Sequence, residues 1–183
     1  MKHLVWIILA MLLLLATVAI GALTDITDLR RAREWNITQA GQAGAELHGV
    51  HVRVAQVWAA TAPSRPERAV IVVRLALRSN EAARQAWIGC DVSLSDGSGR
   101  VWRPLQTANT DGAIKAISPD GESKGRCTPV PYNAPPEGQE ILSDQLFLVP
   151  ADLLKGAKLR VSALGTRPDG LEFPITPAVR ALQ

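Results

Sequence analysis

Cys90 and Cys127 are the two residues of this 183-residue chain whose chemistry depends most directly on each other. In an oxidising compartment two such thiols most often form a disulfide, whereas in a reducing one they stay free. A bridge would close a loop of just under forty residues, which stabilises a fold by about 4 kcal/mol in the chain-entropy description. Two separate buried thiols and a metal site are the alternatives, but neither cysteine has a histidine nearby in the sequence. We therefore predict a disulfide between Cys90 and Cys127.

Histidines and aspartates give weaker signals for a metal site. His48 and His51 are three residues apart, and side chains three apart on a strand point to opposite faces, so one ion cannot readily contact both rings. The segment 109–112 resembles a fragment of a calcium loop but lacks the regularly spaced oxygen ligands and the closing glutamate. We predict no metal site and no cofactor, and interpret the scattered aspartates as turn residues: Asp91, Asp96, Asp111 and Asp120.

Tryptophans are the candidates for a contact surface. Trp58, Trp87 and Trp102 are the residues that we assign to a candidate partner surface, and Trp35 precedes them in the chain. Large aromatic side chains with one polar atom suit interfaces and ligand stacking, and packing in the core or at a sheet edge is the alternative use.

Catalytic motifs are missing from the sequence. It contains no G-x-S-x-G, no H-E-x-x-H and no glycine-rich loop between a strand and a helix, and one of its three histidines is at position 3. We predict no catalytic residues and no enzymatic activity. Carboxylate pairs that form only on folding would leave no trace in the sequence.

The elements that would position these residues begin with an uncharged run from Leu4 to Leu23. Its twenty residues would form a helix about 30 Å long, which matches the hydrocarbon core of a bilayer. Twelve of them are Leu, Ile or Val, which together favour membrane insertion by about 4 to 7 kcal/mol. We predict that residues 1–23 form a transmembrane anchor or signal segment, and that the protein contacts the membrane through this run.

Cleavage and orientation of this segment are each open to two interpretations. A small-x-small pattern at 19–21 would suit cleavage and secretion, but the run exceeds the usual length of a signal sequence, which favours a retained anchor. The arginines at 30, 31 and 33 would place the following domain in the cytoplasm. The two cysteines and the signal-like start favour the opposite side. We predict a single-pass membrane protein whose carboxy-terminal domain is extracytoplasmic.

The 160 residues after Leu23 suit one domain. We expect a juxtamembrane stalk over 24–44 and a β-domain over 45–183. Without Lys2 the net charge falls from +3 to +2, and the basic residues do not cluster among aromatic ones, so we predict no nucleic-acid partner.

From Gly44 onward the hydrophobic period is two, which indicates half-buried strands. The clearest strand is Val70–Leu77, where Ile71, Val73, Leu75 and Leu77 face one way. Strands are also expected at 50–57 with a bulge, 88–95, 101–103, 141–149, 159–163 and 171–175, with a hairpin at 96–99 and a helical turn at 150–154. The stretch 107–136 reads as loop with short strands at 114–117 and 127–130. About seven strands predict a sandwich of two antiparallel sheets.

The segments 49–77, 92–102 and 146–152, together with Leu159 and Val161, resemble the DUF4352 type of immunoglobulin-like domain. The resemblance covers most of the chain after residue 45 and implies a tethered or secreted bacterial β-sandwich. It implies an immunoglobulin-like fold and an extracytoplasmic location, and it supplies no catalytic residues.

These features lead to a functional hypothesis. We expect a membrane-anchored extracytoplasmic binding or scaffolding protein, an accessory subunit of a cell-envelope complex with an envelope protein as partner. A small-ligand or lipid carrier is one alternative, and it would need an apolar cavity between the sheets. An extracytoplasmic hydrolase is the other, and it would need two close carboxylates or a Ser–His contact in a cleft.

Overall fold

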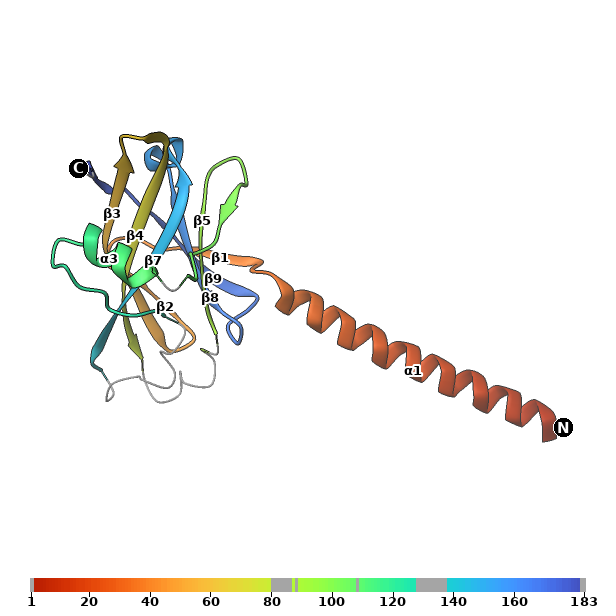
Figure 1. The fold of residues 1–183 in the computed structure, drawn as a ribbon. Helices are drawn as coiled ribbons and strands as arrows, with labels where there is room; N and C mark the ends of the chain where they lie inside the picture. Colours follow the sequence, from red (N-terminus) through yellow and green to blue (C-terminus); the bar gives the residue numbers. More distant parts are fainter. Residues whose placement is uncertain (1, 80–86, 88, 108, 128–137, 182–183) are drawn as a thin grey trace.

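The computed structural model describes residues 2–79, 87, 89–107, 109–127 and 138–181. Its first element is helix α1 (Lys2–Ala32), whose segment His3–Leu23 is long and apolar enough to cross a membrane and is not buried against the rest of the protein. Figure 1 shows α1 projecting away from the β-domain. A retained anchor and a signal sequence would both have this form.

The region expected to be a stalk is structured at both ends. Helix α1 continues to Ala32, and strand β1 (Asn36–Gln39) then pairs in parallel with β9 (Asp169–Pro174). Sheet residues therefore begin at Asn36 and not at 45. This short polar strand carries no alternation of apolar residues, so its pairing could not be read from periodicity.

The β-domain consists of two sheets, which confirms the expected fold class. The first sheet has the order β1-β9-β8-β5-β6, and the second has the order β10-β3-β4-β7, with β2 added beside β3. The remaining strands of the first sheet are β5 (Cys90–Ser95), β6 (Val101–Trp102) and β8 (Lys158–Ala163). Those of the second sheet are β2 (Ala45–Leu47), β3 (Val50–Ala62), β4 (Arg65–Ser79), β7 (Glu140–Pro150) and β10 (Ala178–Ala181).

The described residues form ten strands where about seven were expected. The additional strands include short segments at both ends of the domain, and the pairings of β1 with β9 and of β10 with β3 are parallel, not antiparallel. Short end segments add to an existing sheet edge because its backbone groups need partners. Their sequences therefore need little hydrophobic pattern of their own.

The core lies between the sheets and is built from the predicted faces. Ile71, Val73, Leu75 and Leu77 of β4 all point inward, as their alternation indicated. The register shift between Val54 and Gln56 of β3 is the expected bulge. The hairpin at 96–99 and the helical turn, η1 (Ala151–Lys155), are also confirmed.

The prediction of a short strand at 114–117 is wrong. Residues Thr110–Ile117 form helix α3, which buries Thr110, Ile114 and Ile117 on one face. Residues spaced by three and four positions lie on one face of a helix. This period could not be recognised in the sequence because the apolar residues are few and polar residues surround them. Of the other expected strands, Ile88 and 128–130 lie outside the described residues.

Candidate functional site

The outer face of the second sheet carries side chains in rows, because residues paired across neighbouring strands point the same way. One row is formed by Trp58 of β3, Val72 of β4 and Leu146 of β7. Helix α3 covers this row and packs Ile114 and Ile117 against it. Figure 1 shows α3 lying against β3, β4 and β7. The helix thus closes the middle of this face.

The next row toward the end of β4 holds a buried ion pair. Arg74 donates from Nε and Nη2 to the two carboxylate oxygens of Asp144, at 2.7 and 2.8 Å, and from Nη1 to Asp120 at 2.5 Å. The guanidinium lies 5.0 Å from the ring of Trp58. The pKa of Asp120 is held well below its usual range, and the hydrogen bond from Arg74 is the largest cause. This network fastens the segment after α3 onto the sheet.

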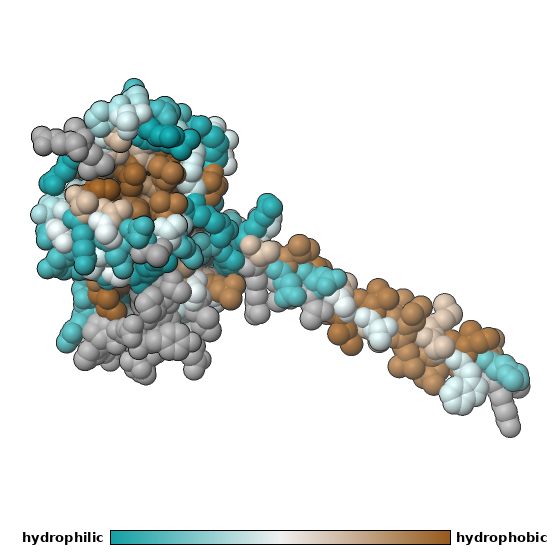
Figure 2. Space-filling view, in the orientation of Figure 1, coloured by the Kyte–Doolittle hydropathy of each residue, from teal (hydrophilic) through white to brown (hydrophobic). Residues whose placement is uncertain are grey.

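A third row, on the other side of α3, is only partly covered. It consists of Ala60, Val70 and Leu148, which are paired across β3, β4 and β7. They line a groove of about 300 Å³, together with Ala62, Ser64, Arg65 and Arg68. Leu148 is 42% exposed, which is high for a leucine in the middle of a long strand. We call this hollow the apolar groove, and Figure 2 shows a hydrophobic patch on this face of the domain.

Arginines surround the apolar groove. Arg65 and Arg68 line it at the β3–β4 turn, and Arg180 of β10 is the register partner of Ala60. All three arginines are exposed. The Nε atom of Arg68 lies 3.7 Å from Oε1 of Glu67. Arg65 and Arg180 form no ion pair within the described residues. The rim of the apolar groove is therefore positively charged.

The outer face of the first sheet differs, because its charges neutralise each other. Glu172 of β9 accepts hydrogen bonds from Gln39, Lys158 and Arg160 at 2.8 to 3.0 Å. Burial alone would raise the pKa of Glu172, but these hydrogen bonds outweigh it and lower the pKa to about 2. This carboxylate is 6% exposed and is fully engaged by its neighbours. We interpret it as a structural group.

The junction between α1 and the sandwich is held by several hydrogen bonds. The backbone N–H groups of Trp35 and Asn36 both donate to the carbonyl oxygen of Pro168, at 2.9 and 3.1 Å. The hydroxyl of Ser162 donates to Glu34 at 2.6 Å. The helix is therefore joined to the first sheet through fixed contacts within two to four residues of its end at Ala32.

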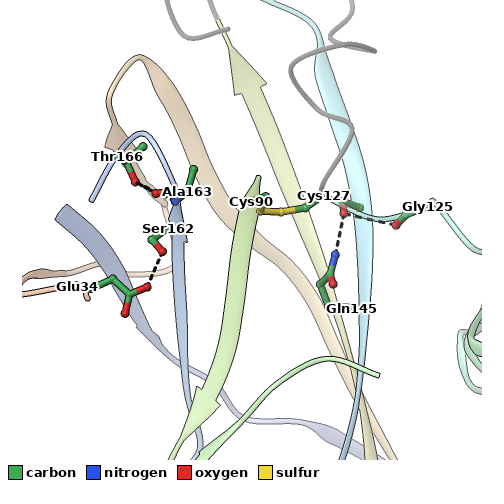
Figure 3. The surroundings of a disulfide bond; sticks show 9 residues. Glu34, Cys90, Gly125, Cys127, Gln145, Ser162, Ala163 and Thr166 are labelled. Carbon is green, nitrogen blue, oxygen red and sulfur yellow. Dashed lines mark hydrogen bonds between the residues drawn. A yellow bond between two sulfur atoms is a disulfide. The ribbon is translucent and has the colours of Figure 1, made fainter. Parts of the chain in front are cut away.

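Cys90 and Cys127 are joined by a disulfide, with their Cα atoms 5.7 Å apart (Figure 3). Cys90 begins β5 of the first sheet. Cys127 follows Gly125, whose carbonyl oxygen accepts a hydrogen bond from the backbone of Asp144 in β7 at 2.7 Å. The bridge thus connects the first sheet to a segment bound to the second sheet.

Of the three tryptophans assigned to a candidate partner surface, two are buried and the third is half-buried. Trp87 is 1% exposed and donates from Nε1 to the carbonyl oxygen of Leu47 at 2.9 Å. Trp58 is buried beneath α3 and Arg74, and Trp102 packs at the edge of the core with Arg100 over its ring. These side chains pack within the fold, which is the other common use of large aromatic residues.

The histidines and aspartates also occupy structural positions. His48 contacts Asp169 at 2.8 Å, and Asn36 donates to the same carboxylate at 2.9 Å. Hydrogen bonds from Asn36 and then His48 lower the pKa of Asp169. Within the described ranges no three His, Cys, Asp or Glu side chains gather as a metal site would require.

The apolar groove was missed by sequence reasoning. Its floor comes from three strands separated by up to about ninety positions in the chain. The available signal was the unbroken apolar run Val70–Val73, which exceeds what one buried sheet face requires. That excess indicates that the outer face is apolar too.

The fold and the site together define a β-sandwich that follows an apolar helix and carries an apolar groove on its second sheet. No protein-family model and no curated protein matches the chain. A solved structure described as "a putative lipoprotein from Staphylococcus aureus subsp. aureus NCTC 8325" is similar over 74% of this chain and 91% of that chain, with 6% identity and a TM-score of 0.41. This similarity is too weak to support a shared function, so the DUF4352-type resemblance stays a prediction.

Proposed function

We propose that this protein is a membrane-anchored binding domain outside the cytoplasm, which serves as an accessory or scaffolding subunit of a cell-envelope complex. The apolar groove is the observation that carries the proposal. Leu148, which is 42% exposed on the floor of this groove, costs free energy while it faces water, and exposed apolar hollows with polar rims are typical of interaction sites.

The anchor and the junction limit where a partner would bind. Helix α1 extends nine residues beyond Leu23, which corresponds to about 14 Å at the rise of an α-helix. The contacts of Glu34 and Trp35 with the first sheet then leave little slack between helix and domain. The domain is therefore held close to the membrane surface, and a partner would have to reach the apolar groove there.

The disulfide supports an extracytoplasmic location, because such bridges persist in oxidising compartments. It outweighs the arginines at 30, 31 and 33, which favour the cytoplasmic side by the positive-inside rule.

The two alternatives receive less support from the packing. A carrier needs space between the sheets, whereas the described inner faces are filled by side chains such as Phe147 and Phe173, each at most 1% exposed. A hydrolase needs free carboxylates or an activated nucleophile in a cleft. Asp120 and Asp144 come together only as the two partners of Arg74 and are not free.

Location is tested by fusing alkaline phosphatase, which is active only outside the cytoplasm, to the carboxy terminus of the full chain. We expect activity that remains in the membrane fraction. An inactive fusion would contradict the proposed side, and activity released into the medium would contradict the anchor.

Binding is tested by placing a photo-crosslinking amino acid at Leu148 in cells. Val101 of β6 is the matched control, because it is also a strand residue and is 57% exposed, but lies in the first sheet. We expect a discrete crosslinked product from position 148 and none from position 101. Equal patterns at both positions, or no product at either, would contradict a binding role for the apolar groove.

A further inference from the structure

We propose that the apolar groove takes an acidic, amphipathic segment of a protein partner, with one or two apolar side chains on its floor and carboxylates at its arginine rim. This inference rests on the proposed binding function and specifies the chemistry of the partner.

The floor selects apolar side chains of limited length. Ala60, Val70 and Leu148 lie on three adjacent strands, so the floor is about 10 Å across at the usual spacing between strands. Ala60 of β3 is 1% exposed and small, which leaves a depression beside Val70 of β4, on the side away from the more exposed Leu148 of β7. One large side chain or two small ones would fill this width. An extended lipid tail would leave most of its length in water, so the dimensions favour a peptide.

The rim selects negative charge. Arg65, Arg68 and Arg180 are exposed around the floor, and Arg68 also lies near the carboxylate of Glu67. A partner with acidic residues beside its apolar anchor would face complementary charge, whereas a basic partner would meet like charge. The first sheet offers no comparable selection, because Glu172 there is paired with Lys158 and Arg160.

The position of α3 explains why the site accepts a segment of a partner and not a flat surface. The row of Trp58, Val72 and Leu146 is already covered by Ile114 and Ile117, so α3 stands above the sheet next to the apolar groove, although none of its residues lines the groove. The β3–β4 turn with Arg65 forms the other side. A single helix or extended strand laid beside α3 would complete the cover of this face, as in groove recognition of amphipathic segments.

The test is selection from a displayed library of random 12-residue peptides against the full-length protein in nanodiscs. Wild-type protein should enrich peptides in which Asp or Glu lies near Leu, Met, Phe or Trp. Selection on the double variant Arg65→Glu and Arg68→Glu should enrich Lys and Arg in place of the acids. Both positions are exposed, so the reversal is compatible with folding.

Affinity measurements with an enriched acidic peptide separate the two parts of the site. The charge-reversal variant should weaken binding about tenfold, and more at low salt than at high salt. Leu148→Glu should weaken it by more than about tenfold, as expected for an apolar anchor, and Val101→Glu should leave it unchanged. Binding that Leu148→Glu does not affect, or wild-type selection of neutral or basic peptides, would overturn the proposal.

The outcomes also separate this inference from the proposed function. A specific in-cell crosslink at position 148, combined with enrichment of non-acidic peptides, would keep the binding role and overturn the acidic partner. If no specific crosslink forms at position 148 and no peptide is enriched, both the binding role and the acidic partner are overturned. Displacement of the peptide by phosphatidylglycerol vesicles, with vesicle binding lost in Leu148→Glu, would assign the apolar groove to lipid and overturn the peptide.

Discussion

Replacing Arg74 by methionine removes the cation that neutralises the buried carboxylate of Asp144. The side chains of Arg74 and Asp144 are 4% and 0% exposed, and two hydrogen bonds of 2.7 and 2.8 Å join them. After the substitution Asp144 keeps the backbone N–H of Lys124 as a donor at 2.9 Å, but no opposite charge in contact. Asp120, whose side chain is 39% exposed, can be hydrated instead and adds little to the loss.

The expected cost follows from this difference in exposure. Removing one member of a buried ion pair costs about 3 to 5 kcal/mol, because the other charge stays buried without compensation. Replacing both members by apolar groups of similar size is often close to neutral. The double variant Arg74→Met and Asp144→Leu should therefore be more stable than Arg74→Met alone, although it contains more substitutions.

Urea unfolding of the full chain in a non-ionic detergent, followed by tryptophan fluorescence at pH 7, measures both effects. With a slope of about 2 kcal/mol per molar urea, the midpoint of Arg74→Met should fall by about 2 M. Trp58 reports directly, since its ring contacts the guanidinium of Arg74. A loss below about 1 kcal/mol for the single variant, or a double variant no more stable than the single one, would refute the reasoning.

Three further predictions concern other parts of the fold. Because the folded-state pKa of Glu172 is lowered to about 2, its contribution to stability is complete above the unfolded pKa of about 4.3 and is lost as the pH falls toward 2. Glu172→Gln should reduce the pH dependence of the urea midpoint in this window, and an unchanged slope would contradict it. Replacing Cys90 and Cys127 by serine should lower the free energy of unfolding by about 4 kcal/mol, from a sequence separation of 37; a reductant should have the same effect on wild type and none on the variant. Glu34 accepts a hydrogen bond from the hydroxyl of Ser162, so Glu34→Ala should loosen the junction. Protease cleavage between helix and domain should then be faster in Glu34→Ala than in the control Glu46→Ala, and equal cleavage rates would speak against a fixed junction.

Local patterns in the sequence accounted for the elements that depend on neighbouring residues. The strand Val70–Leu77, the bulge of β3 and the hairpin at 96–99 each follow from side-chain period or turn chemistry within a few residues. Helix α3 did not follow, because its stripe of Thr110, Ile114 and Ile117 spans only two turns among residues typical of loops. The parallel pairings of β1 and β10 did not follow either, since a short edge strand takes its register from the sheet it joins.

The candidate site shows the same division. The sequence alone determined that an apolar helix precedes a mainly β domain, and it selected Cys90 and Cys127 as a pair, because hydrophobic length, period and residue type are local properties. It also assigned a partner surface to three tryptophans, of which the fold buries Trp58 and Trp87. Only the tertiary structure decided that α3 covers one row of the second sheet and leaves a groove beside it, with Leu148 exposed on its floor. Strand register and helix placement bring residues from distant parts of the chain onto one face, and burial there depends on what packs above them.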